Sequence, residues 1–161
     1  MSDILIKRNH MEIPWHNYVS TGNSQPITEA SLSEKASLIG RTGMMLLSCG
    51  TGAWRVRSSM NTLSEALGIT CSADIGLMSI SYTCFDGESS FSHALSLTTT
   101  GVNTSRLNRL EHFVSDFPAE GIHMSGEALH SQLDEIERIH GLYSPAALGL
   151  ASALALSLIH I

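Results

Sequence analysis

The sequence predicts an α+β fold: a helical hairpin, a β-hairpin or small antiparallel sheet, two further helices, and then the start of a transmembrane helix. Three observations predict this order. Apolar residues recur at helical spacing on both sides of Gly50, which indicates two consecutive helices. From 78 to 83 apolar and polar residues alternate, as they do in a strand with one buried face. No charged residue occurs from Ala146 to Ile159, which is typical of a membrane segment.

The composition narrows the class of protein. The formal net charge of −6 argues against nucleic acid as a partner, because phosphate binding needs a basic surface. Charged residues make up only 15% of the chain, below the usual share of about a quarter, which suits a protein with part of its surface against lipid or other subunits. Cys49, Cys71 and Cys84 form no CxxC motif, so neither a disulfide framework nor a zinc site is indicated. The thiols fit a reducing cytoplasm.

The chain divides into three parts. We expect a poorly ordered leader over 1–29, an α+β domain over 30–141, and the start of a transmembrane helix over 142–161. The N-terminus has no long apolar core and no small-residue cleavage site, so it is not a secretory signal. His10 and His16 in the leader are expected to be solvated, because a metal site would need further ligands at fixed spacing.

The apolar C-terminal run has two interpretations. Pro145 suits the first turn of a helix, but only 16 residues follow it, whereas crossing a hydrocarbon core takes about 20. We therefore expect a truncated membrane span, and the alternative is a buried C-terminal helix of a soluble domain. Residues 156–161 match the translation of a common sequencing adaptor, and we expect them to be non-native.

The helical hairpin is predicted over 31–49 and 53–67. Ser31 or Ser33 can cap the first helix. Two glycines on one face of this helix, Gly40 and Gly43, indicate close approach by another helix. The apolar face of the second helix is formed by Val56, Met60, Leu63 and Leu67.

A β-hairpin is predicted next. Met78, Ile80 and Tyr82 alternate with polar residues, and Asp86-Gly87 is a strong turn signal. The return strand covers about 90–99, with His93 on the same face as its apolar residues and expected to be partly buried. A lone hairpin is marginally stable, so a third strand is expected around 69–75.

Two helices follow the hairpin. Asn103 or Thr104 can cap a helix that ends near Pro118, and Ser125 can cap a helix that ends near Gly141. One face of the last helix is apolar, and its other face is expected to be solvated. The apolar face carries Leu129, Leu133, Ile136 and His140, and the polar face carries Asp134, Glu135, Glu137 and Arg138.

No catalytic motif occurs in the sequence: there is no G-x-S-x-G, no H-E-x-x-H, no P-loop and no dinucleotide fingerprint after a strand. His123, His130 and His140 lack the close spacing of metal ligands. We therefore expect no enzyme activity, no metal and no cofactor.

Short motifs between Gly50 and Pro145 follow one another in a specific order. They are Gly50, Trp54-Arg55-Val56, Leu67-Gly68, Asp86-Gly87, Gly101-Val102-Asn103 with Arg106-Leu107, and Tyr143 with Pro145. This order resembles the N-terminal domain of the threonine/serine exporter family, also found in the smaller subunit of a two-gene bacterial succinate exporter. The resemblance covers about 29–155. Two positions depart from it, because many members carry Glu at the position of Gly52 and often at that of Arg57.

The resemblance implies a cytoplasmic α+β domain that precedes about five membrane helices in an inner-membrane exporter of small polar metabolites, either threonine and serine or a succinate-like dicarboxylate. The domain would gate or assemble the transporter, with the translocation path in the missing helices. Its partners would be the membrane, a second membrane subunit or another copy of the chain, and the transported metabolite. Nucleic acid is not an expected partner.

The candidate polar cluster consists of Arg55, Asp86, Asn103 and Arg106. Each of these residues also has an ordinary structural interpretation: Arg55 in a surface ion pair, Asp86 in a turn and Asn103 as a helix cap. Turn or cap roles are expected for Gly50, Gly68, Gly87 and Gly101. Two other functions remain open. One is a soluble hydrolase that uses a serine, His93 and Asp86. The other is a subunit-interaction module that binds a second membrane protein through the Gly40/Gly43 face and the C-terminal helix.

Overall fold

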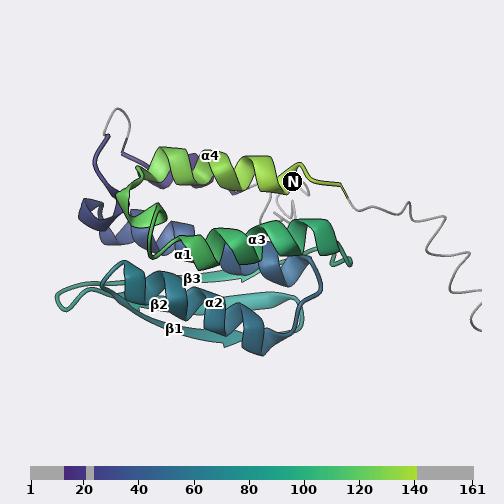
Figure 1. Cartoon of the computed structure of the whole chain (residues 1–161). Coiled ribbons are helices and arrows are strands. Elements are labelled where there is room, and N and C mark those ends of the chain that lie inside the picture. Colours follow the sequence, from purple (N-terminus) through teal and green to yellow (C-terminus); the bar gives the residue numbers. More distant parts are fainter. Residues whose placement is uncertain (1–12, 21–23, 141–161) are drawn as a thin grey trace, which may run out of the picture.

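The computed structural model describes residues 13–20 and 24–140. Within these residues it confirms the α+β class, with four α-helices and three antiparallel strands (Figure 1). The helices are α1 (Leu32–Ser48), α2 (Ala53–Ala66), α3 (Thr104–Asp116) and α4 (Gly126–Glu137); the strands are β1 (Thr70–Ile75), β2 (Ser79–Phe85) and β3 (Ser90–Ser96); and the short 3-10 helices are η2 (Trp15–Tyr18), η3 (Ile27–Glu29) and η4 (Gly121–His123).

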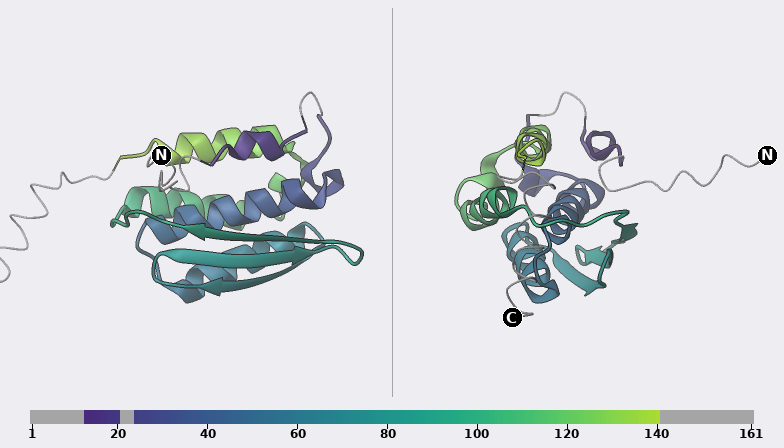
Figure 2. Two further views of the ribbon diagram at one scale, coloured as in Figure 1. Left: turned by 180° about the vertical axis from the view of Figure 1, so that it is seen from behind. Right: turned by 90° about the vertical axis from the view of Figure 1, so that its right-hand side faces the viewer.

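Helix α1 lies at the centre of the domain. The end-on view of Figure 2 shows it surrounded by α2, α3, α4 and the sheet, and it contacts all of them. Every residue from Ala36 to Leu47 is buried, as expected for a helix that is enclosed on all sides. The enclosed residues include a charged one, Arg41, which is 2% exposed.

The sheet has the order β1-β2-β3, so the expected third strand is present and β2 is central. Alternate residues of β2, Ile80, Tyr82 and Cys84, are buried against the helices. The opposite face carries small polar side chains and is exposed. This alternation is the usual pattern of an antiparallel sheet that is covered on one side only.

The predicted helix caps are confirmed at Ser31, Asn103 and Ser125, whose side chains each accept a hydrogen bond from a backbone N–H in the first turn. Three of the four predicted turn glycines have positive φ: 76° at Gly50, 67° at Gly68 and 104° at Gly87. Only glycine adopts these angles readily. Gly101 instead donates its N–H to the carbonyl of Ser48, which ties the loop before α3 to the end of α1.

The glycine face of α1 meets a strand as well as a helix. Gly43 packs against Met60 of α2 and Ile80 of β2, whereas Gly40 packs on the ring of Tyr82 in β2. The prediction of approach by another helix is therefore correct for Gly43 and wrong for Gly40. The Tyr82 hydroxyl reaches past Gly40 to donate to the carbonyl of Ala36 at 3.0 Å.

Parts of the predicted leader pack on the domain. Trp15 in η2 and Ile27 in η3 are 3% and 0% exposed and belong to the hydrophobic core. The leader expected over 1–29 thus contains two segments, 13–20 and 24–29, that pack on the domain through single anchoring side chains, which local periodicity does not reveal.

In the part of the chain that the structure describes, no helix has the length and apolar character needed to cross a bilayer. The predicted start of a transmembrane helix at 142–161 lies outside the described residues.

Candidate functional site

A buried arginine joins α1 to α4. The side chain of Arg41 is only 2% exposed, and one of its terminal nitrogens pairs with two carboxylates of α4. The distances are 2.5 Å to Asp134 and 2.8 Å to Glu137. A buried guanidinium is stable only when it is paired and hydrogen-bonded, so these contacts fix α4 against the central helix. We call Arg41, His130, Asp134 and Glu137 the Arg41 cluster.

His130 completes this cluster from α4. Its Nδ1 lies 3.3 Å from the other terminal nitrogen of Arg41, and its Nε2 lies 3.3 Å from the hydroxyl of Ser37. Because arginine can only donate, Nδ1 must accept and the proton of the neutral ring resides on Nε2. Burial, and then the adjacent Arg41 charge, lower the pKa of His130 to about 3.

Asp134 is ionised in this environment. Partial burial would raise the pKa of its carboxyl, but hydrogen bonds from Arg41 and from His16 outweigh that effect and lower it. His16 comes from η2 and lies 2.9 Å from the second carboxylate oxygen. The expectation of a solvated helix face is therefore wrong for Asp134 and Glu137, whose side chains are partly buried at the Arg41 cluster. His16 is exposed, as expected, although its ring also pairs with Asp134.

A second set of contacts holds the end of α4. The side-chain amide of Asn103 donates to the carbonyl of Ile139 at 3.0 Å, while its oxygen caps α3. One terminal nitrogen of Arg106 donates to the carbonyls of Glu137 and Ile139 at 2.5 and 3.1 Å. We call Asn103 and Arg106 with these two carbonyls the α4 clamp. A cation at a helix C-terminus also interacts favourably with the helix dipole.

The other two residues of the candidate polar cluster lie elsewhere. Arg55 forms an ion pair with Glu111 of α3 at 2.8 Å, with both side chains about 40% exposed, and it stacks on Trp54. Asp86 lies in the β2–β3 turn, where hydrogen bonds from the backbone of Ser89 and Glu88 lower the pKa of its carboxyl. Of the four predicted residues, the structure thus brings together Asn103 and Arg106.

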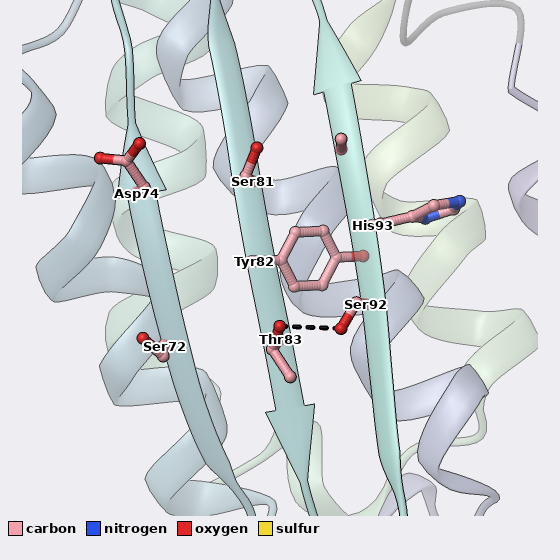
Figure 3. A pocket seen from close by; sticks show the side chains of 8 residues that line it. Ser72, Asp74, Ser81, Tyr82, Thr83, Ser92 and His93 are labelled. Atoms are coloured by element: carbon pink, nitrogen blue, oxygen red, sulfur yellow. Dashed lines mark hydrogen bonds between the residues drawn. The ribbon is translucent and has the colours of Figure 1, made fainter.

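The exposed face of the sheet carries a shallow pocket of about 350 Å³, drawn in Figure 3. Hydroxyl groups dominate its wall, and a 2.8 Å hydrogen bond joins Thr83 to Ser92. Asp74 supplies its one carboxylate and His93 lies at its edge. Asp86 does not line the pocket, so the serine, histidine and aspartate of the hydrolase hypothesis do not assemble there. His93 is partly buried, as expected, with its Nε2 3.5 Å from the hydroxyl of Tyr18.

The described residues contain no group of three or more histidine, cysteine, aspartate or glutamate side chains arranged to hold a metal. The arginines and carboxylates of the site instead form fixed contacts between helices. Such contacts can transmit a displacement of one helix to its neighbours.

Arg41, the centre of the larger cluster, is not among the residues predicted from the sequence. The signal was present, because Arg41 interrupts an otherwise uncharged stretch from Ala36 to Ser48. Two carboxylates three residues apart, Asp134 and Glu137, lie on one side of a helix and can converge on one cation.

Comparison with known proteins supports the resemblance found in the motifs. The family model described as "Putative threonine/serine exporter" (ThrE) matches residues 37–160, which is more than three quarters of the chain. No curated protein matches, and no solved structure does. The matched segment includes all four α-helices, except for the first residues of α1, and the whole sheet. The chain therefore belongs to the threonine/serine exporter family, a family of membrane transport proteins.

Proposed function

We propose that the described domain is the cytoplasmic N-terminal part of an inner-membrane exporter of threonine and serine, and that it gates or assembles the membrane helices. Residues 142–161 would begin the first of these helices. The translocation path would lie among them, because a polar solute needs a protein-lined route through lipid.

The α4 clamp is the observation that carries this proposal. Asn103 and Arg106 bind the carbonyls of Glu137, the last residue of α4, and of Ile139 just beyond it, only a few residues before Tyr143 and the apolar run. The Arg41 cluster fixes the preceding turn of the same helix to α1. Helix α4 is therefore bound to two other helices along the turns that lead to the proposed membrane helix. A movement of that membrane helix would therefore displace the domain, and a movement of the domain would displace that helix.

Exposed apolar side chains indicate which end of the domain faces the membrane. Helix α4 ends on the side of the domain where α2 and α3 begin (Figure 1). Trp54 at the start of α2 is 68% exposed, and Val102 just before α3 is 75% exposed. Tryptophan is enriched where proteins meet the membrane interface. We infer that this end of the domain faces the bilayer.

The two alternative functions have less support. The hydrolase hypothesis needs Asp86 near His93, but the carboxylate of Asp86 is bound by its own turn. The interaction hypothesis needs a free Gly40/Gly43 face, but Tyr82 and Met60 cover that face inside the domain. A second subunit or a second copy of the chain would have to bind elsewhere.

Efflux from cells that produce the complete gene product tests the proposal. Cells are loaded with threonine, serine or succinate, and release is compared with that from cells carrying an empty vector. We expect faster release of threonine and serine, and protection of the domain from protease in right-side-out but not inverted membrane vesicles. Release equal to the vector control would contradict the exporter function. Cleavage of the domain in right-side-out vesicles would contradict its cytoplasmic location.

A further inference from the structure

We propose that Cys71 and Cys84 are a redox modification site, which a low-molecular-weight disulfide such as oxidised glutathione converts from two thiols into a cross-strand disulfide. The proposal concerns the sheet and is independent of the transported solute.

The proposal rests first on the register of strands β1 and β2, which places the two cysteines opposite each other. Cys71 of β1 is the direct partner of Cys84 in the antiparallel pairing with β2. Residues that face each other in this way have Cβ atoms about 4.5–5.5 Å apart. A disulfide needs Cα atoms roughly 4.4–6.8 Å apart and Cβ atoms close to 4 Å apart, so a small approach of the two strands suffices.

The two thiols differ in accessibility and in acidity. Cys84 is fully buried, whereas Cys71 is half-buried on the edge strand, and both are reduced. A hydrogen bond between the side chains lowers the pKa of the Cys71 thiol and, together with burial, raises that of Cys84. Cys71 is the thiol that a solute can reach, and its lowered pKa favours the thiolate there, whereas burial favours the protonated form of Cys84. Since the thiolate is the nucleophile, Cys71 attacks first and Cys84 resolves.

The chemistry balances in two exchange steps. The Cys71 thiolate attacks one sulfur of oxidised glutathione, its S–S bond breaks, and one glutathione thiolate leaves. The leaving thiolate takes the proton of Cys84, whose sulfur then attacks Cys71 and displaces the second glutathione as a thiolate that is protonated by solvent. Two protein thiols are oxidised and one glutathione disulfide is reduced to two thiols.

The product would join the edge strand β1 to the central strand β2. Strand β1 also packs on α2, so the bond would fix the layer of the domain formed by α2 and the sheet. In a cytoplasm kept reduced, such a bond forms only transiently, as in other redox-sensing pairs. Cys49 offers an internal control, because it lies buried at the end of α1 and burial raises the pKa of its thiol.

The test uses the purified chain in detergent, folded and reduced, in glutathione buffers of increasing oxidised fraction. Remaining thiols are blocked with iodoacetamide and the protein is analysed by mass spectrometry. Trypsin leaves Cys71 and Cys84 on one peptide, 58–106, and Cys49 on another. Cleavage before Asp74 then separates the two cysteines unless a disulfide joins them. We expect loss of two of the three thiols, with Cys49 unmodified.

Single variants test the order of attack. In Cys84→Ser a stable glutathione adduct should accumulate on Cys71, whereas Cys71→Ser should react far more slowly at Cys84, and Cys49→Ser should behave like the wild type. Three free thiols in fully oxidised buffer would overturn the proposal. So would a bond that forms only in urea, or oxidation in which Cys49 reacts as fast as Cys71.

Discussion

The guanidinium of Arg41 donates to Nδ1 of His130 across 3.3 Å, at the buried contact between α1 and α4. This contact sets the protonation state of the imidazole. A proton on Nδ1 would point at a group that can only donate, so the folded protein holds His130 neutral. The same arginine pairs with Asp134 and Glu137, so the contact between α1 and α4 depends on ionised carboxylates and a neutral histidine.

Stability should fall in mild acid because of His130. Its pKa is about 3 in the folded protein and close to 6.5 in an unfolded chain. A lowered histidine pKa means that the unfolded state binds the extra proton, so the contribution is complete above pH 6.5 and is lost as the pH falls toward 3. The full effect is about 5 kcal/mol. Urea unfolding at a series of pH values measures it, and His130→Gln should flatten the curve between pH 6.5 and 4. An equally steep curve in that variant would assign the acid sensitivity to other groups.

Removing the charge of Arg41 should destabilise the domain strongly. Arg41→Met leaves Asp134 and Glu137 without their shared cation, and breaking one partner of a buried ion pair costs about 3 kcal/mol or more. Arg109→Met is the matched control, because Arg109 is an exposed residue of α3 and its substitution should change stability by less than about 0.5 kcal/mol. Chemical denaturation of both variants gives the comparison, and equal losses would mean that Arg41 contributes no more than a surface residue.

Gly40→Ala should also be destabilising. A Cβ atom at this position would lie only 2.5 Å from Cζ of Tyr82, a ring that is buried and hydrogen-bonded to Ala36. Overpacking of this kind costs roughly 1–3 kcal/mol. A Cβ at Gly101 meets nothing within 4 Å, so Gly101→Ala serves as the control in thermal unfolding. If both alanine variants melted at the same temperature as the wild type, the close contact between α1 and β2 would be disproved.

Much of this architecture is predictable from sequence, and the reasons for the exceptions are physical. Helix caps and turns are local, so Ser31, Asn103, Ser125 and the positive-φ glycines follow from short motifs. Burial of a charged residue is not local. Arg41 and Asp134 are 93 positions apart, and no periodicity in either helix reveals that they meet.

In the candidate site, too, local features can be predicted from the sequence, whereas contacts between distant residues cannot. Arg106 is one of the candidate residues that the sequence offers. In the structure it binds the carbonyls of Glu137 and Ile139, and such backbone acceptors cannot be recognised in side-chain patterns. The pairing of Cys71 with Cys84 depends on the register of a strand pair, which the sequence does not specify at the level of single residues.

The apolar run at 142–161 should control how the chain partitions. Its run of uncharged residues resembles a membrane segment, so the whole chain should associate with membranes or aggregate. A version ending at Gly141 should remain in the supernatant after high-speed centrifugation. If both versions were equally soluble, the run would be covered by the domain rather than by lipid.

The central claim is that the α4 clamp couples the domain to transport. Threonine efflux per molecule of exporter in the membrane, compared between Arg106→Ala and Arg109→Ala in the complete gene product, tests it most directly. Arg106→Ala should lose most of its efflux at equal membrane abundance, because the carbonyls of Glu137 and Ile139 would lose the guanidinium that ties them to α3. Arg109→Ala, on the exposed side of the same helix, should keep wild-type rates. Equal efflux from the two variants would contradict the account.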